Sequence, residues 1–305
     1  MSFESDLADL SDPTKRLAAT QLVNFSELDE IEAARFEELW PEIDAGRRLT
    51  IVSELTELAA DNVDLNYDAI YKLALRDEEP LVRAAGLHGL YEYEARDLIP
   101  VLAELLRTDL DSTVRREAAI SLGRYALSAE LNQLRADDAA AVRDVLMESA
   151  EDLEEDDRVR GRAIEALGAI SGEETDNLIE SIYEEDSIWL KVGAVDAMGR
   201  SCNETWLPLI LREMENRAPE MRHAAAFAAG EIGDQAAIDS LKRMAVLDPD
   251  REVQLAAIHS LGEIGGSQAK VALKAILYEG DEALEEAVQE ATSEIEFSED
   301  PMGTL

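Results

Sequence analysis

Apolar and polar positions repeat along this chain on two length scales. Within a stretch, apolar or small residues recur near every third or fourth position, which is the spacing of one face of a helix. The stretches themselves recur at intervals of 31 or 32 residues over most of the chain, and each holds two such helical patterns. Self-similarity of this kind predicts a repeat protein built from helix pairs joined by turns.

The second helix of each pair carries the clearer signature. Its apolar start is followed by alanine four or five residues later and, in five units, by glycine nine residues later. The step from Val114 to Val159 is 45 residues, and the extra residues fall near 125–138. Eight units are counted, with starts at Arg47 (the most divergent), Val82, Val114, Val159, Leu190, Met221, Val253 and Leu284.

No helix pair of this kind can bury its apolar stripe alone. Stacking the pairs buries a continuous core, which is the physics of an all-α solenoid. We expect a single solenoid domain over residues 27–297. Residues 1–26 lack the motif and are expected to form a polar helical cap, and residues 298–305 an acidic mobile tail.

The recurring signature "VRxxAAxxLGxI" resembles HEAT repeats of the short bacterial type, which also occur in phycobilin lyase subunits. The resemblance implies a right-handed α-solenoid of about eight helix pairs. It also implies a ladder in which turn acids pair with helix bases from repeat to repeat. The bases would be Arg48, Arg83, Arg115, Arg160, Lys191 and Arg222, with Gln254 and Glu285 ending the series. The turn positions six residues before them hold Glu42, Asp77, Asp109, Glu154, Glu185, Asn216, Asp248 and Glu279.

Charge then narrows the choice of partner. The chain has 68 acidic against 28 basic residues and a net charge of −40. Nucleic acids and anionic membranes gain affinity from Lys and Arg, so neither is expected as a partner. The acidic excess fits a solvated surface, with halophilic adaptation or a basic protein partner as the alternatives.

Location follows from features that are missing from the sequence. No run of 18 apolar residues exists, and the start "MSFESDLADL" lacks the order of a signal peptide. Cys202 is the only cysteine, so no internal disulfide can form. We expect a cytoplasmic protein.

The HEAT resemblance implies that second helices face the concave side of the solenoid. Positions 2, 6 and 10 after each start should then point into the groove. Arginine, apolar and aromatic residues on these rows are typical of interface centres. The alternative is an ordinary inner wall without a partner site. The candidate partner-binding residues are Arg116, Ile120, Arg124, Arg200, His223, Phe227 and His259.

Catalytic chemistry finds little support in the sequence. All three histidines lie at positions 2, 6 or 10 after a repeat start, but the expected distances between them are too long for a shared metal ion. The sequence also contains no motif of a serine hydrolase, no P-loop and no CxxC site. HEAT-type di-iron hydroxylases of the deoxyhypusine kind carry paired His-Glu steps, whereas Gly89, Ala224 and Ser260 follow the histidines here. We therefore expect no catalytic, cofactor-binding or metal-binding residue and no enzyme.

The function predicted from these observations is a non-catalytic scaffold that binds a protein partner along its groove. A chromophore attachment factor of the phycobilin lyase type, or a chaperone, is the alternative that the repeat family brings. The oligomeric state and the identity of the partner stay open.

Overall fold

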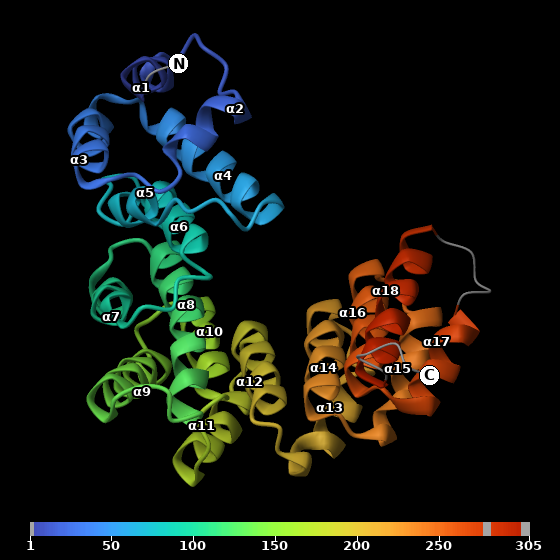
Figure 1. Cartoon of the computed structure of the whole chain (residues 1–305). Helices are drawn as coiled ribbons and strands as arrows, with labels where there is room; N and C mark the ends of the chain where they lie inside the picture. The colour runs from blue at the N-terminus through green and yellow to red at the C-terminus, as the bar shows by residue number, and fades with distance from the viewer. Residues whose placement is uncertain (1–2, 277–281, 300–305) are drawn as a thin grey trace. The chain divides into compact units, whose positions relative to one another are not determined.

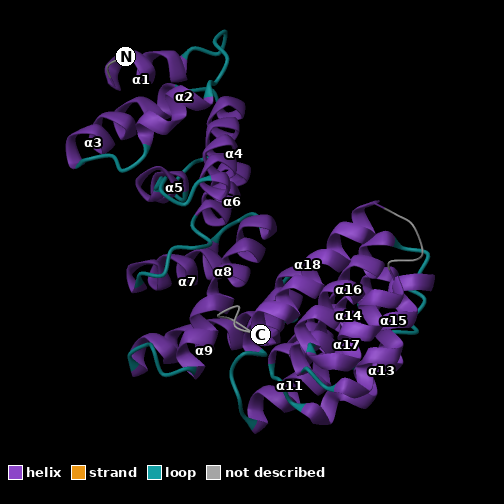
Figure 2. Cartoon of the chain, turned by 45° about the vertical axis from the view of Figure 1, so that its right-hand side comes forward, coloured by secondary structure: helices purple, strands orange, loops and turns teal. Residues whose placement is uncertain are grey.

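The computed structural model describes residues 3–276 and 282–299, and these residues form helices and loops without any strand (Figures 1 and 2). Eighteen α-helices lie in this part of the chain. Five short 3-10 helices accompany them: Val23–Phe25, Trp40–Glu42, Arg96–Leu98, Glu204–Trp206 and Gln235–Ala237. The predicted all-α fold is confirmed.

The helices after the N-terminal segment form the eight predicted pairs. The first helices are α3 (Glu30–Leu39), α5 (Asp68–Ala74), α7 (Ile99–Thr108), α9 (Ala136–Glu151), α11 (Glu173–Tyr183), α13 (Leu207–Glu213), α15 (Ile238–Leu247) and α17 (Gly266–Ile276). The second helices are α4 (Ala45–Asp61), α6 (Pro80–Gly89), α8 (Ser112–Glu130), α10 (Asp157–Leu167), α12 (Ile188–Arg200), α14 (Pro219–Ile232), α16 (Arg251–Ile264) and α18 (Glu282–Glu299).

The chain divides into two compact units, one ending at Tyr125 and one beginning at Ala126. The division falls within α8, in the region where one repeat is longer than the others. The extra residues continue α8 to Glu130 and supply the loop before α9. The division lies inside the predicted domain at 27–297, whose boundaries stay predictions.

An aromatic cluster joins the N-terminal segment to the first helix pair. The segment holds α1 (Phe3–Ser11) and α2 (Ala19–Leu22). Phe25 packs edge-on against both Phe3 and Phe36, with ring centroids 5.7 and 5.6 Å apart, and Phe36 stacks on Trp40. The segment is therefore helical, as expected for a cap, and its apolar side closes the core of the first unit.

Second helices stack on one another within the second unit. The order α10, α12, α14, α16, α18 is followed in space as well as in sequence (Figure 1). Helix α12 is buried along three sides, because it packs on α10, on α14 and on its own partner α11. The stripe left facing away from the core holds Val192, Asp196 and Arg200, which are positions 2, 6 and 10 of the repeat.

The predicted ladder of charged residues links successive pairs. Arg222 pairs with Asp248 at 2.7 Å, with side chains 12% and 5% exposed. The same guanidinium donates to the backbone oxygen of Asn216, and Asp248 accepts from the backbone N–H of Asp250. Equivalent pairs are Arg48–Asp77, Arg83–Asp109 and Arg160–Glu185. The ladder is therefore confirmed at these four rungs.

One rung is built differently, because Asn216 stands where the turn acid is expected. Lys191 lies instead over the ring of Tyr183, 5.6 Å from its centroid. The Tyr183 hydroxyl donates to Glu213 at 2.6 Å, and Glu213 also accepts from Asn216. A tyrosine–glutamate bond thus replaces the ion pair between these two repeats.

The C-terminal end is described up to Glu299. Helix α18 includes residues 298 and 299 of the predicted tail, whereas 300–305 and the predicted turn position Glu279 lie outside the described residues. No helix in the described part of the chain is both long and apolar enough to span a lipid bilayer.

Candidate binding cavity

A cavity of about 540 Å³ lies on the stacked second helices of the second unit. Its lining comes from α10, α12, α14 and the start of α16. The rows at positions 2, 6 and 10 of α12 and α14 all take part, so the repeat positions predicted to face a groove do line a hollow here. The lining includes Trp189, Val192, Asp196, Arg200, His223, Phe227 and Glu231.

Glycine brings the helices that carry the cavity unusually close together. A Cβ atom on Gly193 of α12 would collide with the backbone oxygen of Gly161 on α10. One turn further on, a Cβ on Gly168 would lie 2.6 Å from the Cα of Ala197. Because glycine lies on both helices at the first contact and opposite a small alanine at the second, the backbones approach and the flanking long side chains meet in the cavity.

Glu165 of α10 is the buried centre of the charged lining. Its carboxylate accepts from Arg200 of α12 at 2.6 Å and pairs with Arg162 of its own helix. Only 8% of Glu165 is exposed. One carboxylate therefore holds two guanidinium groups, one from its own helix and one from α12.

Asp196 and Glu231 line the same cavity on the neighbouring helices α12 and α14. Burial holds the pKa of Asp196 well above its usual range, and the charge of Glu165 adds to the rise while Arg162 and Arg200 oppose it. Burial also raises the pKa of Glu231 to about 7, with Arg200 opposing and Glu165 adding. Removal from water disfavours the charged form of both groups.

An aromatic stack separates this cavity from a second one. Phe227 lies between the imidazoles of His223 and His259, with ring centroids 4.8 and 5.4 Å away. Burial lowers the pKa of His223, against the opposing charges of Glu252 and Asp250. The predicted residues His223, Phe227 and His259 are therefore brought together as one wall, with Phe227 filling the gap between the two histidines.

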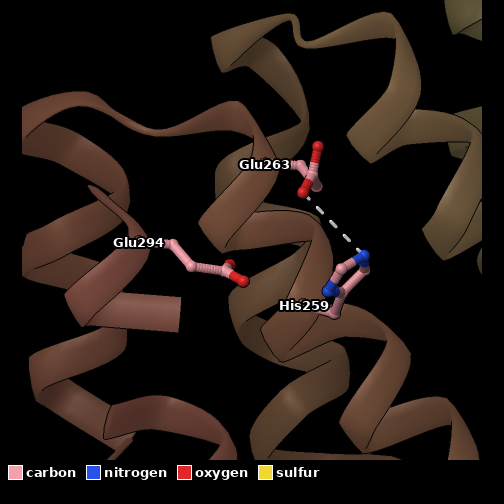
Figure 3. Close-up of side chains that lie close together, drawn as sticks. All are labelled: His259, Glu263 and Glu294. Carbon is pink, nitrogen blue, oxygen red and sulfur yellow. Dashed lines mark ion pairs between the residues drawn. The ribbon is translucent and has the colours of Figure 1, made fainter. Parts of the chain in front are cut away.

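Three possible metal ligands meet beside the second cavity, which measures about 320 Å³. His259 and Glu263 come from α16 and Glu294 from α18, and their ligand atoms lie within 4.8 Å of one another (Figure 3). Imidazole and carboxylate are ligands that divalent cations accept. All three side chains are exposed, and His259 already lies 4.0 Å from Glu263. The prediction that the chain binds no metal stays a prediction.

Three predicted residues belong to the first unit and not to this cavity. Arg116 pairs with the adjacent Glu117, and Ile120 is half-buried on α8. Arg124 lies over the ring of Tyr91, at 5.2 Å from its centroid. Tyr91 lines a separate cavity of about 510 Å³ at the ends of α4 and α6. The predicted set is therefore divided between the two units, and its role in partner binding stays a prediction.

The sequence-based choice missed four residues that shape the cavity: Glu165, Trp189, Asp196 and Glu231. Three of them occupy positions 6 and 10, so the repeat register already marked them. They were passed over because acidic residues are abundant everywhere in this chain. Trp189 lies in the first turn of α12, one position before the repeat start Leu190, and so falls outside the chosen rows.

Comparison with known proteins agrees with this architecture. The family model for HEAT repeats matches residues 67–143, 175–249 and 207–293, which together span more than half of the chain. The CpcE–CpcF complex of phycocyanin lyase from Nostoc superposes with a TM-score of 0.60. The alignment covers 88% of this chain and 97% of that chain at 17% identity, and at this identity it shows the fold alone.

Two further matches concern an enzyme. Deoxyhypusine hydroxylase-B from Oryza sativa subsp. japonica is 22% identical over 241 residues, which are 73% of this chain and 80% of the rice protein. The solved human deoxyhypusine hydroxylase aligns over 96% of both chains at 15% identity, but its TM-score of 0.39 is too low to support a conclusion.

The rice match corrects one prediction. The absence of known catalytic motifs and of paired His-Glu steps predicts that the chain is not an enzyme, and this prediction is contradicted by a similar protein that is named for its activity. The histidine pattern describes one kind of metal site and does not exclude catalysis as a whole.

Both the repeat geometry and the matched segments lead to the same family. The helix pairs recur at the predicted positions, and the ladder of arginines and turn acids joins them. The chain belongs to the HEAT-repeat family.

Proposed function

We propose that the chain is a repeat scaffold whose second unit binds a basic and apolar segment of a partner protein. The observation that carries this proposal is the cavity of about 540 Å³ on the second helices, which combines aromatic walls with an acidic lining. A recessed site of this size accommodates a few side chains of a docked segment.

The apolar part of the lining supports a protein partner. Trp189 is 39% exposed at the start of α12, and Phe227 and Val192 are half-buried deeper in the cavity. Large aromatic side chains left open to solvent gain free energy when a partner covers them, and Trp is enriched among the residues that dominate binding. Phe227 is already held in place by His223 and His259, so its docking surface is preformed.

The charges of the lining select the kind of segment. Two arginines stand against six carboxylates: Glu165, Asp196, Glu220, Glu231, Asp250 and Glu252. Both arginines pair with the buried carboxylate of Glu165, although their own side chains are 43% and 38% exposed. The potential of the cavity is therefore negative, which attracts Lys and Arg and repels acidic segments.

A selection from random peptides displayed on phage, with the whole chain as bait, tests the proposal. We expect enriched peptides to combine basic with apolar residues and to lose binding to the variant Phe227→Ala. The matched control is Phe297→Ala, since Phe297 is 70% exposed on α18 and lies outside the cavity lining. Peptides that bind both variants like the parent chain, or a selection without enrichment, would refute docking in this cavity.

The likeness to phycocyanin lyase adds nothing to the choice of function, because a shared fold does not bring a shared activity. Chromophore attachment and a chaperone role remain the predicted alternatives, and no specific observation favours either of them.

The rice relative favours a second candidate, the hydroxylation that its name describes. A di-iron centre built on paired His-Glu steps does not fit these residues. His88 lies in the first unit, His223 packs against Phe227, and among the described residues only His259 belongs to a group of three possible metal ligands. We therefore derive no catalytic step. Incubating the chain, with and without added iron, with a deoxyhypusine-bearing protein would show a mass gain of one oxygen atom if this candidate holds.

A further inference from the structure

Two carboxylates face the cavity without a partner of their own. Among the residues described, Asp196 and Glu231 form neither a side-chain hydrogen bond nor an ion pair, although Arg162 and Arg200 lie near. Asp196 is half-buried and Glu231 is exposed on the cavity wall, so a cation or a hydrogen-bond donor that enters the cavity can reach both. These two groups therefore have unused capacity to accept hydrogen bonds.

The neighbouring arginines do not donate hydrogen bonds to these two carboxylates, because both arginines pair with Glu165. Arg200 donates to one oxygen of Glu165 at 2.6 Å, and Arg162 pairs with the other. The carboxylate of Glu231 reaches over α12 to Gly199, where it lies at a point that a Cβ atom would occupy. The two free carboxylates thus stand on adjacent rigid helices.

Aromatic surfaces complete the surroundings of this pair. Phe227 lies four residues before Glu231 on α14, and Trp189 stands at the start of α12. The chain already places a guanidinium on this tryptophan, since Arg158 lies 4.4 Å from the centroid of its ring. Aromatic faces attract cations, and the planar guanidinium stacks on them as well.

We infer that the cavity recognises an arginine side chain of the partner, whose guanidinium bridges Asp196 and Glu231 while its stem packs on Phe227. This inference rests on the proposed function and specifies it. Arginine fits better than lysine, because its five N–H donors form a rigid fork that can serve two carboxylates at once, whereas an ammonium group is a point charge.

The probe is N-acetylarginine methylamide, followed by the NMR signal of the Trp189 indole N–H, which the variant Trp189→Phe assigns. Trp40 and Trp206 are buried and serve as internal references. We expect saturable shifts of the Trp189 signal, with roughly tenfold weaker binding of the lysine analogue. The citrulline analogue keeps the shape of the arginine probe but not its charge. It should not bind at concentrations at which the arginine probe saturates the protein.

Variants identify the two carboxylates. Asp196→Asn and Glu231→Gln should each weaken binding of the arginine probe by roughly tenfold, since each removes one charged acceptor. Glu220→Gln is the matched control, because Glu220 lines the same cavity but takes no part in the bridge. Equal losses in all three variants would show general attraction by negative charge and overturn the inference.

The outcomes separate this inference from the proposed function. If selected peptides bind through Phe227 but the arginine and citrulline probes behave alike, docking stands and arginine recognition fails. If the arginine probe binds and no peptide is enriched, the cavity takes the cation but the protein-docking proposal fails.

Discussion

At the residue scale, the balance of charge in one cavity decides what it can bind. Glu165 pairs with two arginines, while Asp196 and Glu231 at the cavity wall have pKa values raised first by desolvation and then by the charge of Glu165. The pKa of Glu231 lies at about 7, so its proton leaves close to neutral pH. Charge in the cavity is therefore sensitive to small changes of pH.

The titration of Glu231 predicts a dependence of stability on pH. The folded pKa of about 7 exceeds the value of about 4.3 expected for an unfolded chain, so the folded state retains a proton that the unfolded state has released. Stability from this group is complete below the unfolded pKa and is lost as pH rises through about 7. The variant Glu231→Gln should remove this loss.

Thermal unfolding monitored by circular dichroism measures the effect. Glu231 keeps part of its surface in water, so screening reduces the gain of Glu231→Gln to about 1 kcal/mol, or roughly 2–4 °C, at about pH 8. At about pH 5 the variant and the parent chain should melt alike. A constant difference across this range would contradict the assignment of the titration to Glu231.

At the element scale, two devices hold neighbouring repeats in register. Glycines on facing second helices set how closely the backbones approach, and the ladder of arginines and turn acids sets how successive turns align. Both devices recur because each repeat packs between two repeats that are built in the same way. They also place the cavity residues, since α10 and α12 meet at Gly161 and Gly193.

Gly193→Ala tests the close approach. Alanine normally stabilises a helix interior by up to about 1 kcal/mol relative to glycine. Here its methyl group would meet the backbone of Gly161, so we expect a net loss of about 2 kcal/mol in the free energy of unfolding. Urea unfolding measures it. Gly46→Ala is the control, because only the Asp44 side chain lies near that position.

Arg222→Gln tests the ladder. The change leaves Asp248 buried without its cation, and breaking a buried pair costs about 3 kcal/mol. Arg243→Gln is the matched control, since Arg243 and Glu215 are 53% and 72% exposed and such pairs contribute about 0–1 kcal/mol. Equal effects of the two variants in urea unfolding would show that the rung has no special role.

At the scale of the whole molecule, net charge opposes folding of both units. The chain carries −40, with 68 acidic and 28 basic residues, and many of those basic residues are used inside the ladder and the cavity. Like charges on the surface therefore repel one another, and this repulsion destabilises the compact state.

Sodium chloride should consequently raise the melting temperature. The screening length falls to about 8 Å at 0.15 M salt and about 3 Å at 1 M. We expect a total rise of roughly 5 °C, equivalent to about 2 kcal/mol, with the steepest part below 0.15 M. A rise that begins only near 1 M would indicate salting-out of apolar surface instead, and a fall would show that pairing outweighs repulsion.

The sequence by itself determined the repeat and the number of helix pairs, and its resemblance to HEAT repeats implied the ladder. These features are periodic, so each copy adds to the same signal. Positions such as Arg83 and Asp109 stand at constant offsets because every repeat must satisfy the same contact. Periodicity also marked positions 2, 6 and 10 as one surface, which α12 and α14 bear out.

Only the tertiary structure decided which of these surface positions form a site. It divides Arg116 and Arg124 from His223 and Phe227, because the chain folds as two units with the boundary in α8. It selects Asp196 and Glu231 from many carboxylates, because a place on a cavity wall without an ion-pair partner is a property of packing and not of residue type. A periodic pattern specifies the residues that every repeat has in common. A binding site depends instead on the residues that differ between repeats and on how the packing brings them together.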